Sequence, residues 1–168
     1  YVARVIHADL TLANASSWQW WTALTNADYK DGLIYLDSGD NSDLFNLDKI
    51  KYNGDFHDSK LLWALGNYSR FVKPGMVRVN VESDENEVSI IKQYKDIMLS
   101  AYLDKETSEV AIVTINYSNK NKVIDVSNYN INEIYVTSSM KNLAKNVIQN
   151  KQIILEARSI STLIGSIL

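Results

Sequence analysis

The strongest constraint on the fold is a change of hydrophobic period at Pro74-Gly75. Before this dipeptide, apolar residues recur every three or four positions, which is typical of helices. After it, Val77, Val79 and Val81 alternate with polar residues, which is typical of a strand. Proline does not continue a helix, and glycine tolerates the positive φ that a type II turn needs at its third residue. The sequence therefore predicts a tight turn here, between a front part that contains helices and a rear part built of strands.

Two helices are predicted in the front part, at residues 2–13 and 59–72, from apolar positions that line one face of each. Asp58 or Ser59 can cap the second helix. Gly66 in its middle predicts close packing against another backbone. We expect this helix to dock on the β-rich part, because it runs directly into the first strand there.

Between the two helices, the aromatic-rich residues 16–24 predict a strand that is covered on both faces. Residues 25–58 are rich in Asp, Asn, Gly and Lys, and they predict a long loop region with room for one hairpin near the apolar residues 33–36. Helix, strand, long loop and helix is the order in which an α/β barrel ends. Residues 1–75 alone are too short to form such a barrel.

The rear part consists of short apolar segments separated by polar turn clusters. Beyond the valines at 77–81, strands are predicted at 97–103, 110–117, 123–126, 131–137, 152–157 and 159–167. Strands of this length and spacing are typical of an antiparallel sandwich. The predicted fold class is mainly β: an antiparallel β-sandwich preceded by a helix–strand–loop–helix remnant of the end of a (β/α)8 barrel. The predicted domains are residues 1–75 and 76–168.

Composition excludes several classes of function. The 168 residues include no Cys, which rules out disulfides, Cys-based zinc sites and thiol catalysis. A formal net charge of −3 gives no electrostatic footprint for nucleic acid or for an anionic membrane. No apolar stretch approaches the roughly 20 residues that cross a bilayer. No signal peptide is visible, and Tyr1 reads as the middle of a domain, so we expect a fragment of a longer protein.

No complete catalytic set is visible in the sequence. We interpret His7, which lies beside apolar residues and far from His57, as a packed or surface residue rather than a metal ligand. Nucleophile-elbow, dinucleotide-binding and phosphate-loop motifs are absent. Hydrolysis of a glycoside needs two carboxylates that flank the scissile bond. All glutamates fall in the rear part, and we interpret them as residues of solvated turns: Glu82, Glu85, Glu87, Glu106, Glu109, Glu133 and Glu156. We predict no catalytic residue, no metal and no cofactor.

Aromatic residues form the densest cluster of candidate binding groups. The chain has 10 Tyr and 4 Trp but only 3 Phe, so aromatics with a polar group dominate. Trp18, Trp20 and Trp21 fall within one short segment, and Asp28-Tyr29-Lys30-Asp31 follows. Indole rings stack on the C–H face of a pyranose, while Asp and Tyr hydrogen-bond its hydroxyls. Trp18 and Trp20 can also fill a core, whereas Trp21 lies nearest the loop. The candidate substrate-binding residues are Trp21, Trp20 and Tyr29.

Six stretches carry a family resemblance when they are taken together and in order. They are ARVIHADLTLANASSWQWWTAL (3–24), DYKDGLIYLD (28–37), SKLLWALGNYSRFVKPGMVRV (59–79), IVTINYSN (112–119), YVTSSMKNL (135–143) and ARSISTLIG (157–165). In this combination the chain resembles the C-terminal part of glycoside hydrolase family 30. The resemblance implies the end of a (β/α)8 barrel fused to a side β-sandwich that also uses strands from before the barrel.

The same resemblance implies retaining, endo-acting cleavage of β-linked polysaccharides by two glutamates, near the ends of the fourth and seventh barrel strands. The chain would begin in the helix after the seventh strand, so both glutamates would lie upstream and the fragment alone would be inactive. Only the eighth strand and its loop can be matched, and they place Trp21 and Tyr29 beside the substrate cleft. The implied partners are the polysaccharide and the rest of the parent barrel, with no nucleic acid and no membrane.

The resemblance leaves the substrate open among xylan, β-1,6-galactan and β-1,6-glucan, from plants or microbes. Residues 22–25 (TALT) stand where the glucuronoxylan-specific branch ends its eighth strand with an Arg and a Tyr. The DYKDGLIY loop looks more like the branch that cleaves β-1,6-linked galactan or glucan. A polymeric substrate implies that the protein is secreted.

Two other functions are compatible with the residues. The first is a free-standing carbohydrate-binding module that uses the sandwich and the tyrosines at 94, 102, 117, 129 and 135, of which Tyr102 and Tyr117 lie in predicted strands. Whether these two tyrosines share a sheet face does not follow from the sequence. The second is a structural or interaction domain with no role in sugar binding.

Overall fold

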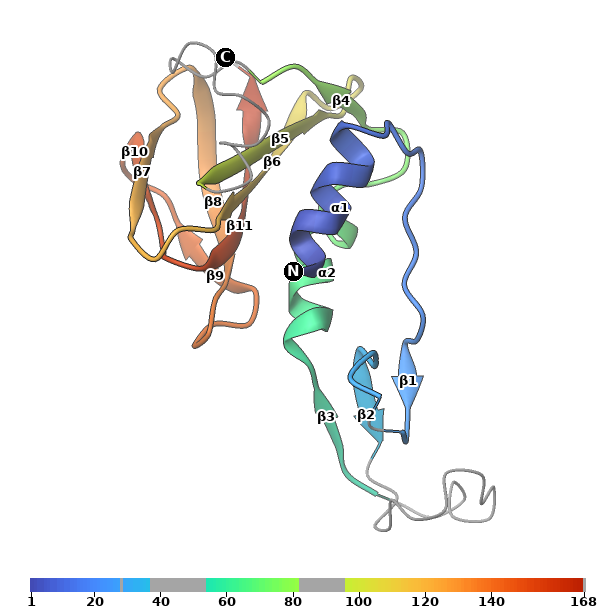
Figure 1. Ribbon diagram of the computed structural model, residues 1–168. Coiled ribbons are helices and arrows are strands. Elements are labelled where there is room, and N and C mark those ends of the chain that lie inside the picture. Colours follow the sequence, from blue (N-terminus) through green and yellow to red (C-terminus); the bar gives the residue numbers. More distant parts are fainter. Residues whose placement is uncertain (28, 37–53, 82–95, 168) are drawn as a thin grey trace.

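The computed structural model describes residues 1–27, 29–36, 54–81 and 96–167. Its main feature is an antiparallel six-stranded sheet in the order β4-β5-β6-β11-β8-β9. These strands are β4 (Val77–Val79), β5 (Ile97–Leu103), β6 (Glu109–Asn116), β11 (Ser159–Ile167), β8 (Tyr129–Thr137) and β9 (Ala144–Val147). A second antiparallel sheet of β7 (Lys122–Asp125) and β10 (Gln152–Leu155) lies over one face, and helices α1 (Val2–Thr11) and α2 (Lys60–Ser69) cover the other (Figure 1). The fold is mainly β, an antiparallel sandwich preceded by the helical front part, as predicted.

Side-chain alternation along the strands gives the large sheet two buried faces. One face packs against β7 and β10, in a cluster that includes Ala101, Val110, Ile112, Ile134, Ile153, Leu155 and Leu163. The other face packs against α1 and α2, in a cluster that includes Ile6, Tyr68, Met98, Tyr102, Val113, Ile115 and Ile160. Because both faces are covered, every residue of β6 from Val110 to Asn116 is buried. This explains why residues 110–113 form a continuous apolar run instead of alternating with polar residues.

Helix α2 docks on the sheet, as expected, and Ser59 is its N-cap. The Ser59 hydroxyl accepts a hydrogen bond from the Leu62 amide at 3.2 Å and donates one to the Leu33 carbonyl at 3.0 Å. The close backbone packing expected at Gly66 is wrong. A Cβ at that position would meet only the Leu143 side chain, at the ordinary contact distance of 3.6 Å. Gly66 therefore makes room for the Leu143 side chain and not for a second backbone.

A buried polar network fixes the register of α2 on the sheet. The Asn67 amide nitrogen donates to the Thr137 hydroxyl on β8 and to the Trp63 carbonyl, both at 2.8 Å. The Thr162 hydroxyl on β11 lies 2.6 Å from the Asn67 carbonyl oxygen and 3.1 Å from its side-chain oxygen. Asn67 and Thr162 are fully buried, so these polar groups depend on one another for hydrogen bonds. The network joins one helix to two strands that are distant in sequence.

The turn at Pro74-Gly75 has the predicted form. Gly75 has a φ of 94°, and the Met76 amide donates to the Lys73 carbonyl at 3.2 Å. This is the backbone pattern of a type II turn with proline second and glycine third. The turn leads the chain from the end of α2 into β4.

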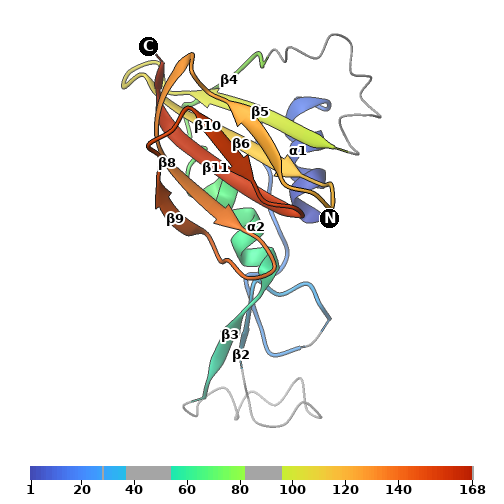
Figure 2. The ribbon, with the colours of Figure 1, turned by 90° about the vertical axis from the view of Figure 1, so that its left-hand side faces the viewer.

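The strand predicted for residues 16–24 is wrong over most of its length. Only Leu24–Thr25 form a strand, β1, which pairs in parallel with β2 (Ile34–Leu36). Of the preceding tryptophans, Trp18 and Trp20 are held by side-chain hydrogen bonds instead of a backbone ladder. β2 pairs with β3 (Phe56–Asp58) in antiparallel fashion, so the apolar residues expected to form a hairpin do lie in an antiparallel strand pair. In Figures 1 and 2 this small sheet projects beyond the far end of α2, away from the sandwich.

Two further differences concern the rear part. β9 (Ala144–Val147) lies outside the predicted strands, although it pairs with β8 at the edge of the large sheet. Glu109 and Glu133 lie in β6 and β8 and not in turns. Asp28, Glu82, Glu85 and Glu87 lie outside the described residues.

Candidate functional site

The first two tryptophans of the cluster are fixed in place by their N–H groups. The Trp18 indole nitrogen donates to the Asp9 carboxylate on α1 at 2.9 Å, and the Trp20 indole nitrogen donates to the Asp31 carbonyl at 2.6 Å. Their rings stack at 5.8 Å between centroids, with 17° between the planes. Trp18 also packs against the helix-side core. Trp18 and Trp20 are both half-buried, so each supports the segment while keeping part of its ring accessible.

Trp21 and Tyr29 are the exposed members of the predicted site. Trp21 is 84% exposed and Tyr29 is 71% exposed. The peptide bond between Trp21 and Thr22 is cis. An indole ring that is this exposed offers both a flat apolar face and an N–H donor to a ligand.

The loop that carries Tyr29 is held against the tryptophan segment by backbone contacts. The Asp31 carbonyl accepts from the Trp20 indole and, at 3.4 Å, from the Thr22 amide. Further along, the Leu33 amide donates to the Thr22 carbonyl at 3.0 Å. Tyr29 stands two residues before Asp31, so the structure brings its loop beside Trp20 and Trp21.

Gly32 explains the tightness of this loop. A Cβ at Gly32 would lie 2.5 Å from the Thr25 methyl group and 3.0 Å from the Tyr35 ring, so only glycine fits without a shift of its neighbours. The Gly32 amide donates to the Tyr35 hydroxyl at 3.0 Å, and the Tyr35 ring stacks on His57 of β3 at 5.1 Å. The small sheet is therefore held together by specific side-chain contacts and is not a loose loop.

Sequence reasoning missed one exposed aromatic on this sheet. Phe56 on β3 is 72% exposed, and Leu24 on β1 is 58% exposed. Phe56 lies in a polar sequence context (GDFHD), so periodicity gives no signal for a strand there. The only hint in the sequence that this aromatic ring faces solvent is that Phe56 is a single apolar residue among polar neighbours.

Three of the four glutamates that the structure describes are paired with lysines. Glu109 pairs with Lys73 at 3.0 Å, Glu133 with Lys145, and Glu156 with Lys141. Hydrogen bonds from Lys145 and Tyr135 lower the pKa of Glu133, and a hydrogen bond from Lys141 lowers the pKa of Glu156. A general acid in glycoside hydrolysis needs a raised pKa. Glu133 and Glu156 therefore have the electrostatics of structural ion pairs.

The two histidines have separate structural surroundings. His7 is only 6% exposed, so of the two interpretations, packed or surface residue, the first holds. His57 is exposed and stacks on Tyr35. Burial, together with the charge of Arg78, lowers the pKa of His7 to about 4. Within the described residues, no group of three or more His, Asp or Glu side chains is arranged to hold a metal ion. None of the described helices combines the length and apolarity needed to cross a bilayer.

Two of the tyrosines that a sandwich-based binding module would use, Tyr102 and Tyr117, pack on the helix-covered side. Tyr102 is 4% exposed and packs under the helices. Tyr117 packs against the same cluster, with the Arg4 and Arg158 guanidinium groups at 4.2 Å and 4.4 Å from its ring centroid. The two tyrosines share a face, but neither forms part of an open aromatic row.

Comparison with known proteins points to one family of enzymes. A sequence model described as O-glycosyl hydrolase family 30 matches residues 1–35. A crystal structure of a conserved exported protein from Bacteroides fragilis is 39% identical, with a TM-score of 0.84, and the match covers 98% of this chain and 32% of that protein.

Two family 30 xylanases share the fold at lower identity. The catalytic domain of xylanase C from Talaromyces cellulolyticus is 18% identical, with a TM-score of 0.70 and coverage of 98% of this chain and 34% of that chain. An endoxylanase from Clostridium papyrosolvens is 21% identical, with a TM-score of 0.62 and coverage of 98% and 36%. The chain spans about a third of the length of these relatives. The resemblance of this chain to the C-terminal part of a glycoside hydrolase family 30 enzyme, expected from its sequence, is thereby confirmed.

Proposed function

We propose that this chain is the C-terminal part of a retaining, endo-acting glycoside hydrolase that cleaves a β-linked polysaccharide. The observation that carries the proposal is the likeness of the chain over 98% of its length to about a third of several family 30 xylanases. The match of residues 1–35 to the family's sequence model supports it independently. The catalytic glutamates are supplied by the upstream part of the parent protein, so this chain alone does not hydrolyse glycosides.

The chain has two roles in the parent enzyme under this proposal. Residues 1–75 complete the barrel, and residues 76–168 form the side sandwich that supports it. The buried contacts of Asn67 with Thr137 and Thr162 support such a scaffold role, because they join a helix of the first part to strands of the second. A cleft wall needs a rigid support if its side chains are to keep their positions during turnover.

The cleft wall is formed by Trp21, Trp20 and Tyr29. The exposure of Trp21 and Tyr29 supports this assignment, and so does the hydrogen bond that ties the Trp20 indole to the loop at Asp31. We propose that Trp21 stacks on a sugar ring, with Trp20 as the neighbouring support and Tyr29 as a hydroxyl partner. The substrate is xylan, β-1,6-galactan or β-1,6-glucan of plant or microbial origin.

We further propose that the parent protein is secreted, because its polymeric substrate cannot enter a cell. The similarity to a protein described as exported supports this. The parent's partners are its polysaccharide and, for this chain, the rest of the barrel.

Substitution of Trp21 in the longer protein tests the cleft assignment. Trp21→Ala is expected to lower kcat/KM on the polysaccharide by about tenfold, which corresponds to about 1.4 kcal/mol of lost stacking. Met140→Ala is the matched control, because Met140 is 89% exposed on the sandwich and its loss should leave kcat/KM unchanged. Unchanged turnover in Trp21→Ala would favour a purely structural role for this chain.

Affinity electrophoresis separates the proposal from a free-standing binding module. The isolated chain should show weak or no retardation in gels that contain xylan, β-1,6-galactan or β-1,6-glucan, because one cleft wall alone presents few contacts. Strong retardation that survives Trp21→Ala would favour a binding module on the sandwich.

A further inference from the structure

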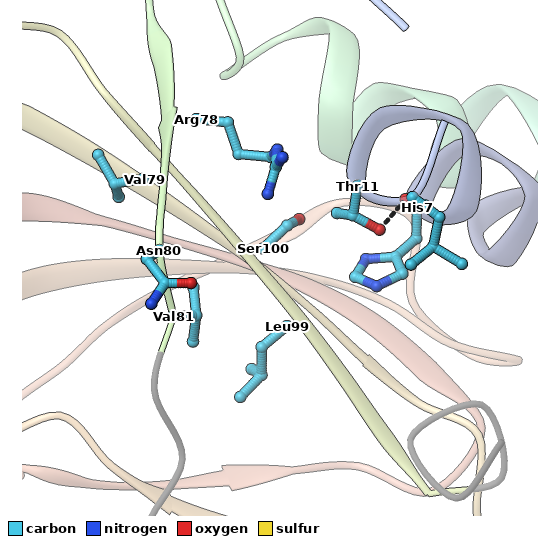
Figure 3. A pocket seen from close by; sticks show the side chains of 9 residues that line it. His7, Thr11, Arg78, Val79, Asn80, Val81, Leu99 and Ser100 are labelled. Carbon is cyan, nitrogen blue, oxygen red and sulfur yellow. Dashed lines mark hydrogen bonds between the residues drawn. The ribbon is translucent and has the colours of Figure 1, made fainter. Parts of the chain in front are cut away.

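A small polar pocket lies between the last turn of α1, strand β4 and strand β5, and none of the proposed sugar-binding residues lines it (Figure 3). Its volume is about 120 Å³. At about 30 Å³ per water molecule, this is space for roughly four waters. The lining combines polar groups with apolar walls, and its members are His7, Thr11, Leu12, Arg78, Val79, Asn80, Val81, Leu99 and Ser100.

Arg78 brings the positive charge to this pocket. It stands opposite Tyr102 in the β4–β5 ladder, on the face that α1 covers, and its guanidinium group donates to the Asn14 side-chain oxygen at 2.6 Å. Among the residues that the structure describes, no carboxylate lines the pocket and none forms an ion pair with Arg78. The guanidinium group therefore keeps donors available for a planar anion.

Ser100 supplies a second polar group at the floor of the pocket. It is 2% exposed, and its hydroxyl has no hydrogen-bond partner within the part of the chain that the structure describes. A buried hydroxyl without a partner is costly and needs an explanation. Figure 3 shows the Ser100 oxygen directed into the space between Arg78 and α1.

We propose that this pocket binds a small carboxylate, with Arg78 holding the two carboxylate oxygens and the Ser100 hydroxyl donating to one of them. Leu12 at the end of α1 adds an apolar side chain to the lining, whereas Val79 and Val81 pack against the sandwich-side core. The lowered pKa of His7 keeps its imidazole neutral at pH 7, so Arg78 is the cation that lines the pocket. Helix α1 ends at Thr11 beside the pocket, and its carbonyl end weakly opposes an anion, so binding depends on the guanidinium group.

The test is a titration of the ¹⁵N-labelled 168-residue chain with sodium acetate, followed by NMR, with sodium chloride at equal ionic strength as the reference. Acetate should produce saturable shifts at the amides of residues 78–81 and 99–100, which chloride does not produce. Arg78→Gln should weaken acetate binding at least about tenfold, because it removes the charged bidentate donor. Ser100→Ala should weaken it about three- to tenfold while the chain stays folded, since it deletes only a buried hydroxyl without a partner.

The matched control is Arg70→Gln, because the Arg70 guanidinium lies over the Phe71 and Tyr135 rings and not in the pocket. Its acetate affinity should equal that of the unaltered chain. Equal shifts with acetate and chloride would overturn the proposal, and so would acetate binding that persists in Arg78→Gln. Either result would leave the glycosidase assignment untouched, because that assignment uses none of these residues.

Discussion

Removal of the Asn67 side chain should lower the free energy of unfolding by about 3 kcal/mol, through bonds within α2 and between α2 and the sheet. Asn67→Ala deletes three hydrogen bonds: two from the amide nitrogen at 2.8 Å, to Trp63 and Thr137, and one from Thr162 at 3.1 Å. Each contributes about 1 kcal/mol net. The cavity left by the amide adds a smaller loss. Part of the network survives, because Thr162 still reaches the Asn67 carbonyl at 2.6 Å and Thr137 still accepts from the Leu143 amide at 3.1 Å.

Urea unfolding of the two chains measures this loss. The midpoint should fall with an unchanged m-value, because the native fold is retained while its stability drops. Ser69→Ala, on the exposed side of the same helix, should change the free energy of unfolding by no more than about 0.5 kcal/mol. A loss below about 1 kcal/mol in Asn67→Ala would refute the claim that this network carries the docking of α2.

Two further predictions concern the sheet and α1. Gly165→Ala should destabilise the protein by about 1–3 kcal/mol in the same urea assay, because the new Cβ would lie 2.2 Å from the Asn130 carbonyl oxygen on β8. Unchanged stability would show that β11 and β8 can separate at Gly165. For His7, the pKa of about 4 in the folded protein lies below the ordinary value of 6.5, so the unfolded chain binds more protons between these values and stability should fall as the pH drops from 6.5 towards 4. Above pH 5, where carboxylates contribute little, His7→Gln should reduce this pH dependence of the unfolding free energy, whereas His57→Gln, at an exposed position, should not. An equal pH dependence in the unaltered chain and in both variants would contradict the burial of His7.

The predictable part of the fold rests on local signals. Helix α2 follows from its apolar face, a Ser59 cap and the Pro74-Gly75 stop, all of which act within a few residues. The prediction for residues 16–24 is wrong because an aromatic-rich run is typical of a buried strand. In the structure, the Trp18 and Trp20 indoles are instead held by hydrogen bonds to Asp9 and Asp31. Strand β9 carries no alternation, because it is an edge strand with three of its four residues exposed.

The arrangement of the candidate site likewise depends on tertiary contacts that local sequence signals do not predict. The sequence presents three tryptophans of equal chemical character in one segment. Only tertiary hydrogen bonds show that Trp18 and Trp20 use their indole nitrogens internally, while Trp21 faces solvent. Likewise, no sequence pattern places Arg78 beside Ser100, because that neighbourhood depends on the pairing of β4 with β5.

Release of reducing sugar, measured on the same polysaccharide with the isolated chain and with the longer protein, tests the account most directly. We predict hydrolysis of xylan, β-1,6-galactan or β-1,6-glucan by the longer protein and none by the 168-residue chain, because retaining hydrolysis needs two carboxylates about 5 Å apart that the upstream part supplies. Hydrolysis by the isolated chain, or none by the longer protein on any of the three, would contradict it.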